Sequence, residues 1–287
     1  MQRYHCNTCG KSFQSNRRKK RKEKKILDWY VWERQTYTNL AKRLDIGYKT
    51  IQRFLLEIDV KSVVKIDKRN VVLVVDTTFF SRTDGLCVFR EPNLKMNLWW
   101  KFTPHETLHV YQSGKQHLEK NGFHIHGVVI DGKRGVRQLF EPIPVQMCHF
   151  HQKQIIKRYI TDRPRLEASK ELKLIVATLT KTDEQTLTHE LEQWYTKWEV
   201  FLKERTTDIE TGRWHFTHKR LRSAYRSLKT NLPYLFTYQR YPELHIPNTT
   251  NSLDGWFNRL KSLLHVHRGL SKIRRNKVIK IIIKGQN

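Results

Sequence analysis

The segment that most constrains the fold is 71–75, in which five aliphatic residues run directly into Asp76. No polar residue alternates with them, and this pattern predicts a short strand that is buried on both faces. We expect the strand to end at Asp76. A carboxylate at the end of a buried strand lies where open α/β sheets usually place a functional site, although a core strand capped by a solvated Asp is the alternative.

Two other segments place a carboxylate in a comparable position. Residues 127–130 predict a second apolar strand, which is followed by Asp131 and by a glycine suited to a tight turn. Residues 249–261 predict the opening of a helix that carries Asp254. The apolar stripe of this helix consists of Leu253, Trp256, Phe257, Leu260 and Leu264, and its polar face of Asp254, Asn258 and Lys261. Three carboxylates, two at strand ends and one on a helix, are the oxygen ligands that a pair of Mg²⁺ or Mn²⁺ ions requires.

The charge of the chain indicates the class of its partner. The 287 residues include 55 Lys and Arg against 27 Asp and Glu, a formal net charge of +28. An excess of this size predicts a polyanionic partner, above all nucleic acid. Ribosomal and chromatin-packing proteins are also basic, but they are usually shorter and poorer in aromatic residues, whereas this chain contains eight Trp.

Other totals exclude several classes. No apolar run approaches the roughly 18 residues of a membrane span, and the N-terminus lacks the apolar core of a secretion signal. The four cysteines are Cys6, Cys9, Cys87 and Cys148. They do not suggest a disulfide framework in a chain of this length, so we expect a protein of the reducing cytoplasm without a membrane partner.

The N-terminal segment 1–14 resembles half of a zinc ribbon. Cys6 and Cys9 form one Cys-x2-Cys knuckle with a trailing glycine and aromatic residue. Zinc requires four ligands, so Cys6 and Cys9 would hold Zn²⁺ only with a second pair. We favour a missing upstream half; completion by His5 and a distant residue, or two ordinary thiols in a frayed end, are the alternatives. The charged run that follows is expected to be a basic linker, 15–25.

Residues 26–60 predict a helix-turn-helix. Residues 38–55 have its layout, with Gly47 in the turn and with Ile51, Phe54 and Leu55 burying the second helix. The side chains left to face a DNA groove are Tyr48, Lys49, Thr50, Gln52 and Arg53. A plain helical hairpin is the alternative.

Residues 70–152 predict a mixed α/β core. Strands over 85–90 and 97–102 follow the first strand as an antiparallel meander. A helix over 111–122, a strand over 124–131, a short helix over 135–140 and a short strand over 145–147 come next. An antiparallel triplet followed by alternating helices and parallel strands is the ribonuclease H-like order. In that order, the carboxylates that end the first and fourth strands meet at one edge.

Cys148 and His151 follow the last short strand at Cys-x2-His spacing. Two ligands alone do not hold zinc, so we expect these side chains to orient neighbouring groups or a nucleic acid backbone.

Residues 153–247 interrupt this alternation and predict a helical insertion. Trp194 and Trp198 lie at helical spacing and are expected in its core. Trp214 follows a Thr-Gly pair in a basic loop, where a flipped base could stack on it. In the tail, 265–284, Arg274 and Arg275 belong to a basic helix that either faces DNA or is simply a solvated face.

Taken together, these features resemble the DDE transposases of the Mutator-like superfamily, in the branch found in bacterial and archaeal insertion sequences. The matching features are the strand that ends in Asp76, the Val-Ile-Asp131-Gly segment, the Cys148-x2-His151 pair and the Thr-Asn251-x2-Asp254 opening of a late helix. The resemblance covers about residues 71–270. It implies a two-metal centre of Asp76, Asp131 and Asp254, although the family usually has Glu at the third position. Asp208 and Glu210 are the nearest rivals for that place.

The expected fold is therefore α/β: a ribonuclease H-like catalytic domain with a mixed five-stranded sheet and an all-helical insertion, preceded by a helix-turn-helix and a partial zinc ribbon. The core is expected over 70–152 and is completed by 248–287. The resemblance implies a nucleoid-associated enzyme that binds terminal inverted repeats and catalyses cleavage and strand transfer on double-stranded DNA as a homodimer or larger assembly. A catalytically inactive DNA-binding relative and a structure-specific nuclease are the alternatives.

Overall fold

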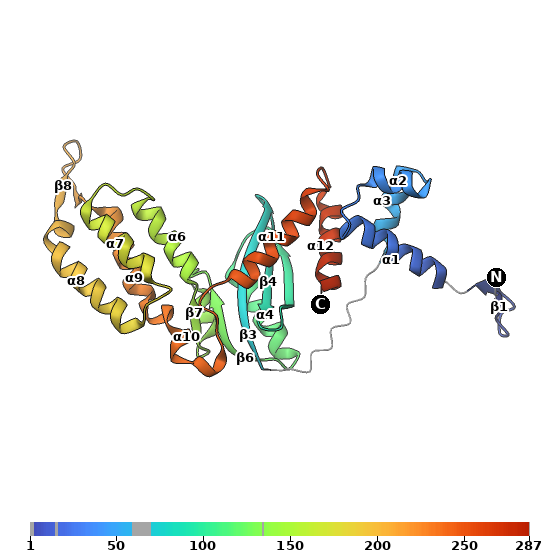
Figure 1. Cartoon of the computed structure of the whole chain (residues 1–287), viewed down its shortest axis with the longest axis horizontal. Helices are drawn as coiled ribbons and strands as arrows, with labels where there is room; N and C mark the ends of the chain where they lie inside the picture. Colours follow the sequence, from blue (N-terminus) through green and yellow to red (C-terminus); the bar gives the residue numbers. More distant parts are fainter. Residues whose placement is uncertain (1–2, 15–16, 59–69, 134, 287) are drawn as a thin grey trace. The chain divides into compact units, whose positions relative to one another are not determined.

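A computed structural model gives the fold, and it describes residues 3–14, 17–58, 70–133 and 135–286 (Figure 1). The chain forms two compact units. One comprises Met1–Lys65 and Gly255–Asn287, and the other Ile66–Asp254. The predicted core segment 248–287 is therefore divided between the two units after Asp254.

The second unit is a mixed α/β domain built on a five-stranded sheet. Its strands are β3 (Asn70–Ser81), β4 (Asp84–Glu91), β5 (Met96–Thr103), β6 (His124–Ile130) and β7 (Val145–Met147). They lie in the order β5-β4-β3-β6-β7. β3, β4 and β5 pair antiparallel, whereas β3, β6 and β7 pair parallel. The predicted meander, followed by parallel strands, is confirmed.

Buried residues alternate along the strands and so define two faces of this sheet. Val71, Leu73 and Val75 of β3 pack in one cluster with α4 (Leu108–Lys120) and α5 (Val136–Phe140). Because side chains alternate along a strand, Val72 and Val74 point to the other face. On that face the buried Arg90 of β4 donates from Nε to Ser252 Oγ at 3.1 Å, so the start of α11 (Asn251–His265) lies over it.

Strand β3 is longer than predicted, because it continues past Asp76 to Ser81. The prediction was wrong about this end of the strand. Pairing with β6 stops at Val74, but the antiparallel partner β4 continues, so that Asp76 lies opposite Val88 and Thr78 opposite Leu86. Asp76 therefore lies inside a strand, at the point where the sheet loses its parallel neighbour.

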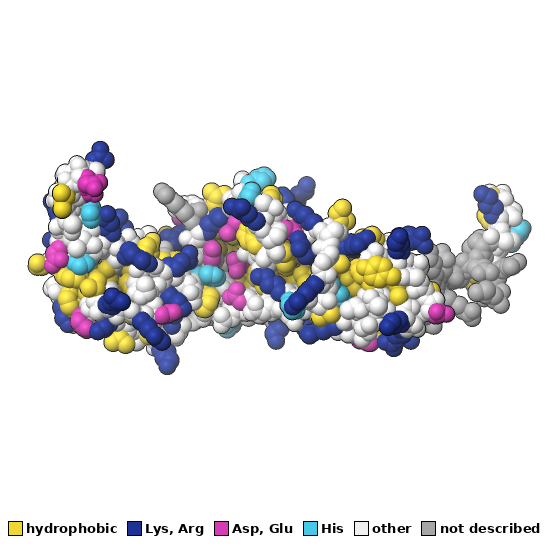
Figure 2. Space-filling model, turned by 90° about the horizontal axis from the view of Figure 1, so that it is seen from above, with side chains coloured by type: hydrophobic (Ala, Val, Ile, Leu, Met, Phe, Trp, Pro, Cys, Tyr) yellow, Lys and Arg dark blue, Asp and Glu magenta, His cyan; other side chains and the backbone are white. Residues whose placement is uncertain are grey.

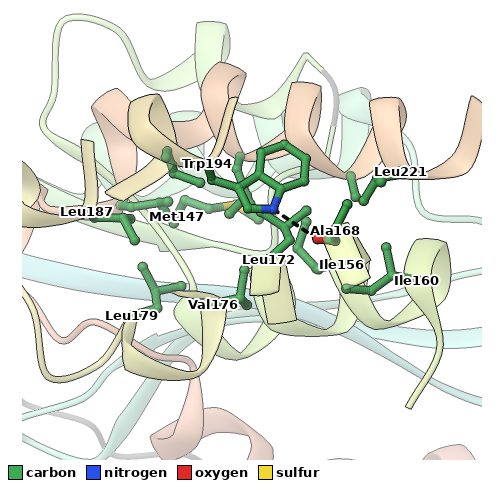
Figure 3. Packing of buried hydrophobic residues seen from close by; sticks show 14 of the residues in the cluster. Met147, Ile156, Ile160, Ala168, Leu172, Val176, Leu179, Leu187, Trp194 and Leu221 are labelled. Carbon is green, nitrogen blue, oxygen red and sulfur yellow. Dashed lines mark hydrogen bonds between the residues drawn. The ribbon is translucent and has the colours of Figure 1, made fainter. Parts of the chain in front are cut away.

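An insertion follows β7 and has its own apolar core. Its helices are α6 (His149–Ile160), α7 (Glu167–Thr178), α8 (Glu184–Lys203), α9 (Lys219–Leu235), α10 (Thr237–Arg240) and the 3₁₀ turn η1 (Pro242–Leu244). Trp194 lies in the middle of this core and donates from its indole to the carbonyl of Ala168 at 2.9 Å (Figure 3). The predicted core position of Trp194 is confirmed.

The prediction that the insertion is all-helical was wrong. Between α8 and α9 it contains an antiparallel hairpin of β8 (Arg205–Thr207) and β9 (Trp214–Phe216), which projects from one end of the insertion (Figure 1). Two β-branched threonines favour the strand β8, and Gly212 supplies the positive φ of the connecting loop. Trp214 consequently lies in a strand rather than in a loop.

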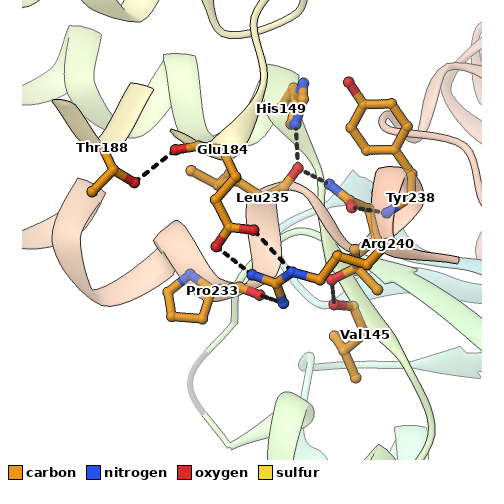
Figure 4. Close-up of polar contacts among 10 residues, drawn as sticks. Val145, His149, Glu184, Thr188, Pro233, Leu235, Tyr238 and Arg240 are labelled. Carbon is orange, nitrogen blue, oxygen red and sulfur yellow. Dashed lines mark hydrogen bonds and ion pairs between the residues drawn. The ribbon is translucent and has the colours of Figure 1, made fainter. Parts of the chain in front are cut away.

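Polar contacts fix the insertion to the edge strand β7 (Figure 4). The buried side chains of Gln146 and His149 both donate to the carbonyl of Leu235, at 2.8 and 2.6 Å. Thr237 donates to the carbonyl of Val145 at 2.7 Å. Gln146 and Thr237 therefore join β7 to the insertion, through the carbonyls of Leu235 in α9 and Val145 in β7, whereas the His149 contact links α6 to α9 within the insertion.

The first unit contains the remaining elements. It starts with the strands β1 (Arg3–His5) and β2 (Ser12–Gln14) and the helices α1 (Arg17–Val31), α2 (Tyr37–Leu44) and α3 (Tyr48–Glu57). It also includes α11 from Gly255 onward and α12 (Lys272–Gln286). The run predicted as a basic linker is helical from Arg17, while 15–16 and 59–69 lie outside the described residues.

The two predicted helices around Gly47 are confirmed. Ile51 and Leu55 of α3 are buried, and Phe54 is half-buried. The left-handed residue of the turn is Asp45, with φ of 50°, whereas Gly47 is extended and immediately precedes α3.

None of the helices in the described part of the chain is long and apolar enough to span a bilayer.

Candidate active site

The parallel pairing of β3 and β6 brings two predicted site residues level with each other. Val74 lies opposite Val129, so Asp76 and Asp131, each two residues further along, leave the paired region at the same height. Val128 and Ile130 pack toward α4 and α5, which places Val129 and Asp131 on the same side of the sheet as Asp76. The register therefore directs both carboxylates to the face that carries the start of α11.

A chain of contacts from β6 leads to the third carboxylate. The amide of Cys148 donates to the carbonyl of Ile130 at 2.9 Å, directly before Asp131. The amide of Thr250 donates to Cys148 Sγ at 3.3 Å, and its hydroxyl donates to Asp254 Oδ2 at 2.8 Å. Asp254 is thus oriented from the strand that ends beside Asp131.

Thr250 is a residue that sequence reasoning missed as a positioning group. It is fully buried and touches both Cys148 and Asp254. Its place four residues before Asp254 on a predicted helix was a usable signal, because side chains at i and i+4 are neighbours. Asn251, part of the motif that carries the resemblance and the neighbour of Thr250 in the chain, is exposed.

Local hydrogen bonds orient the other two carboxylates. Asp76 Oδ1 accepts from the amide of Thr77 at 2.7 Å, and Asp131 Oδ1 accepts from the amide of Lys133 at 2.9 Å. These contacts use one oxygen of each carboxylate. Gly132, with φ of 85°, makes the turn that returns the Lys133 amide to Asp131.

Burial, together with the negative charges of Asp131 and Asp254, raises the pKa of Asp76 to about 7. The Thr77 amide and the charge of His151 act in the opposite direction. The charges of Asp131, Asp254 and His151 therefore all act on Asp76. Like charges held close together favour a proton or a cation between them.

Two further groups on this side have shifted pKa values. Burial by itself lowers the pKa of His151, but the neighbouring Cys148 and the charges of Asp76 and Asp131 outweigh it and raise the pKa to about 9. Burial raises the pKa of Cys148, but hydrogen bonds from His151 and Thr250 reverse this and leave it below its usual value. His151 is therefore a cation at neutral pH beside the acidic groups.

Figure 2 shows acidic side chains gathered between the insertion and the sheet, whereas Lys and Arg are spread over the insertion. Carboxylates with free oxygens are the hard ligands that Mg²⁺ and Mn²⁺ prefer, so the donor chemistry fits a divalent cation. These side chains are not arranged as a complete metal site. Within the described ranges, no three His, Cys, Asp or Glu side chains are grouped so that they could hold a metal ion.

The remaining predicted site residues lie elsewhere. Tyr48, Lys49 and Arg53 are exposed on α3, Thr50 and Gln52 are half-buried, and Gln52 donates to the Tyr48 hydroxyl at 2.7 Å. Arg274 and Arg275 are half-buried on α12. Asp208, a rival for the third carboxylate, accepts from the amides of Glu210 and Thr211 and therefore closes the β8–β9 loop.

Cys6 and Cys9 lie between β1 and β2 in a hairpin. The amide of Gly10 donates to the carbonyl of Cys6 at 2.9 Å, and Gly10 has φ of 69°. Backbone hydrogen bonds from Cys9 and Thr8 lower the pKa of Cys6. A thiol of lowered pKa is a better metal ligand, so this turn fits half of a zinc site.

No protein-family model matches the chain, and no curated protein matches it significantly.

Proposed function

We propose that this protein is a transposase whose second unit is a ribonuclease H-like catalytic domain that cleaves and transfers DNA strands with divalent metal ions. The strand order β5-β4-β3-β6-β7, with its change from antiparallel to parallel pairing at β3, supports the ribonuclease H-like assignment. The observation that carries the proposal is geometric: the strand register brings Asp76 and Asp131 level at one edge of the sheet. Asp254 is linked to the end of β6 through Thr250 and Cys148.

In this proposal Asp76, Asp131 and Asp254 hold Mg²⁺ or Mn²⁺, which supply charge stabilisation at both the attacking and the leaving oxygen of a phosphodiester. Thr250 orients Asp254, and the turn at Gly132 orients Asp131. His151 as a cation offsets part of the negative charge while the DNA phosphate approaches. Metal binding is expected to draw the carboxylates into closer contact than they have by themselves.

The first unit supports a role in reading DNA ends. In the proposal, α2 and α3 act as a helix-turn-helix, with the exposed Tyr48, Lys49 and Arg53 facing a groove. The net charge of +28 favours simultaneous contact with two duplexes. Because two element ends must be handled together, the working form is expected to be a homodimer or a larger assembly.

Replacing Thr250 by Val is expected to weaken Mn²⁺ binding roughly tenfold. The substitution removes the hydroxyl that donates to Asp254 Oδ2, and a hydrogen bond to a charged group contributes about 1.5–3 kcal/mol. Isothermal titration with Mn²⁺ measures this effect. Thr250→Ser keeps the hydroxyl and should restore the affinity; equal affinities of the Val and unaltered proteins would show that Thr250 does not position a ligand.

The direct test of the proposed activity is strand cleavage. The unaltered protein, incubated with Mg²⁺ or Mn²⁺ and with a plasmid that carries the gene and its flanking DNA, should nick or excise at the gene's borders. Asp131→Asn keeps the acceptor for the Lys133 amide but removes the charge, so cleavage should fall by roughly a thousandfold or more while binding to the same borders is retained.

A second candidate function is DNA binding without catalysis. The observation that favours it is that the described carboxylates do not form a ready three-ligand group. Under this alternative the unaltered protein binds the border DNA but does not cut it with either metal. Cleavage that persists unchanged in Asp131→Asn would instead contradict the assigned site.

A further inference from the structure

A basic cleft lies in the insertion, and none of the three carboxylates lines it. It has a volume of about 530 Å³ and lies between the end of α6, the loop before α7 and the start of α9. Four of its lining residues are cationic: Arg163, Arg165, Lys219 and Arg220. The lining residues in the described part of the chain include no Asp or Glu.

Two carboxylates near the cleft already have partners. Asp162 pairs with Lys157 at 2.7 Å, and Glu204 accepts a hydrogen bond from Nε2 of His218, itself a lining residue, at 2.9 Å. In addition, α7 and α9 both begin at the cleft without a side-chain hydrogen bond at the N-terminus. Four side-chain cations and two helix starts produce a positive potential that suits phosphate.

The β8–β9 hairpin leads directly into this cleft, because β9 is followed by Thr217 and His218 and then by α9. Trp214 on the hairpin is 53% exposed, and the guanidinium of Arg205 lies 4.0 Å from its ring centroid. Phe216 contacts Trp214 edge-on, and Arg222 of α9 lies 3.5 Å from the Phe216 ring. Two guanidinium groups therefore flank the Trp214–Phe216 pair, one on the hairpin and one on the helix that lines the cleft.

These contacts hold Trp214 in place while leaving half of its surface open. A rigid, exposed indole beside cations is the arrangement with which proteins stack unpaired bases, since any base can present its ring face. A base inside a duplex cannot offer that face. A purely duplex-binding surface would need the cations but would have no use for an exposed tryptophan.

We propose that the cleft and the hairpin together bind an unpaired DNA strand, with a phosphate in the cleft and a base against Trp214. We call this region the single-strand surface; it consists of Arg163, Arg165, Lys219, Arg220 and Trp214. Its biological role rests on the proposed function, in which strand cleavage produces unpaired ends. Its binding activity does not, because no metal and no cleavage are needed.

The test is fluorescence anisotropy of the full chain with a labelled oligothymidine in EDTA. Trp214→Ala should weaken binding about tenfold, which is within the range of one lost base stack. On an abasic strand of equal length the same substitution should have no effect. Tyr241→Ala, which removes another exposed aromatic side chain of the same unit, is the control and should leave both affinities unchanged.

The cations are tested by the double variant Arg163→Ala, Arg165→Ala. It should weaken oligothymidine binding and lower the slope of log affinity against log salt by about 1.4, or about 0.7 for each phosphate that the variant no longer neutralises. The matched control removes two cations elsewhere on the insertion, Lys197 and Lys203, each of which pairs with a carboxylate. Equal reductions of affinity in both double variants would overturn the proposal in favour of unspecific attraction.

Two other results would also overturn it. Equal loss of abasic and oligothymidine binding in Trp214→Ala would show that Trp214 acts on the fold and not on a base. Unchanged binding of oligothymidine in both the Trp214 and the arginine variants would place single-strand binding elsewhere. Failure of the cleavage experiment has no influence on these outcomes, because the binding experiment contains no metal.

Discussion

Asp76→Asn is expected to abolish the proposed metal-dependent strand cleavage and, at the same time, to raise the melting temperature at pH 8 in the absence of metal. Both effects have one cause. The buried Asp76 has a pKa raised to about 7, so its negative charge destabilises the folded state whenever the pH is well above that value. Asn is the uncharged equivalent and retains an oxygen that can accept from the Thr77 amide.

The pH dependence has a definite sign. An unfolded Asp has its pKa near 3.8, so between that value and about 7 the folded state binds the proton more tightly. The contribution of Asp76 to stability is therefore greatest below pH 4, falls as the pH rises to 7 and is constant above it. The upper bound of this loss is roughly 4 kcal/mol, at 1.36 kcal/mol for each pKa unit.

Thermal unfolding at pH 5 and pH 8, with and without Mn²⁺, measures the prediction. A domain of this size gains about 2–4 °C for each kcal/mol. The melting temperature of Asp76→Asn should exceed that of the unaltered protein at pH 8 without metal. This difference in melting temperature should shrink at pH 5. Mn²⁺ should stabilise the unaltered protein at pH 8 but not the variant.

Asp162→Asn is the matched control, since it removes a carboxylate that pairs with Lys157 at the surface. It should change neither cleavage nor the response to Mn²⁺. A lower melting temperature of Asp76→Asn at pH 8 would contradict the burial of an unfavourable charge. Retained cleavage would remove Asp76 from the catalytic group.

Gly132→Ala is expected to destabilise the protein by roughly 2–5 kcal/mol and to weaken Mn²⁺ binding. Gly132 has φ of 85°, where an L side chain costs about 1–2 kcal/mol. Its added Cβ would also overlap the side chain of Met147. Met147 is fully buried against the core of the insertion, so it has little room to move, and overpacking of this kind typically costs about 1–3 kcal/mol.

Gly212→Ala is the matched control for this substitution. Gly212 has φ of 66°, but nothing lies within 4 Å of an added Cβ. It should show only the backbone cost of about 1–2 kcal/mol. Denaturant unfolding compares the two variants, and titration with Mn²⁺ reports on Asp131. Equal destabilisation of both variants would mean that Met147 adapts without cost and that the turn can shift freely.

The sequence predicted the sheet well because its strands are short, apolar and separated by clear turn signals. The runs that end before Asp76 and Asp131 are short and rich in β-branched residues, so a strand was favoured over a helix. The apolar stripe on α11 was also predicted correctly, since Leu253, Trp256 and Leu260 are all buried. The spacing of apolar residues depends only on near neighbours in the chain, so it can be read from the sequence alone.

The errors concern pairing rather than periodicity. The sequence placed the end of β3 at Asp76, because the run of apolar residues ends there. The strand continues because β4 supplies a partner for Thr77 and Thr78. The β8–β9 hairpin was missed for a similar reason, since three-residue strands become stable only when they pair.

The sequence by itself determined the alternation of strands and helices, the positive charge and the identity of three acidic residues at predicted element ends. Only the tertiary structure decided that Asp76 and Asp131 lie level on one face, that Thr250 links Cys148 to Asp254, and that Trp214 lies on a hairpin beside a basic cleft. The physical reason is that side-chain periodicity depends on near neighbours in the chain. Strand register, burial and the electrostatic interaction of groups such as Asp76 and Asp254 depend on segments that only folding brings together.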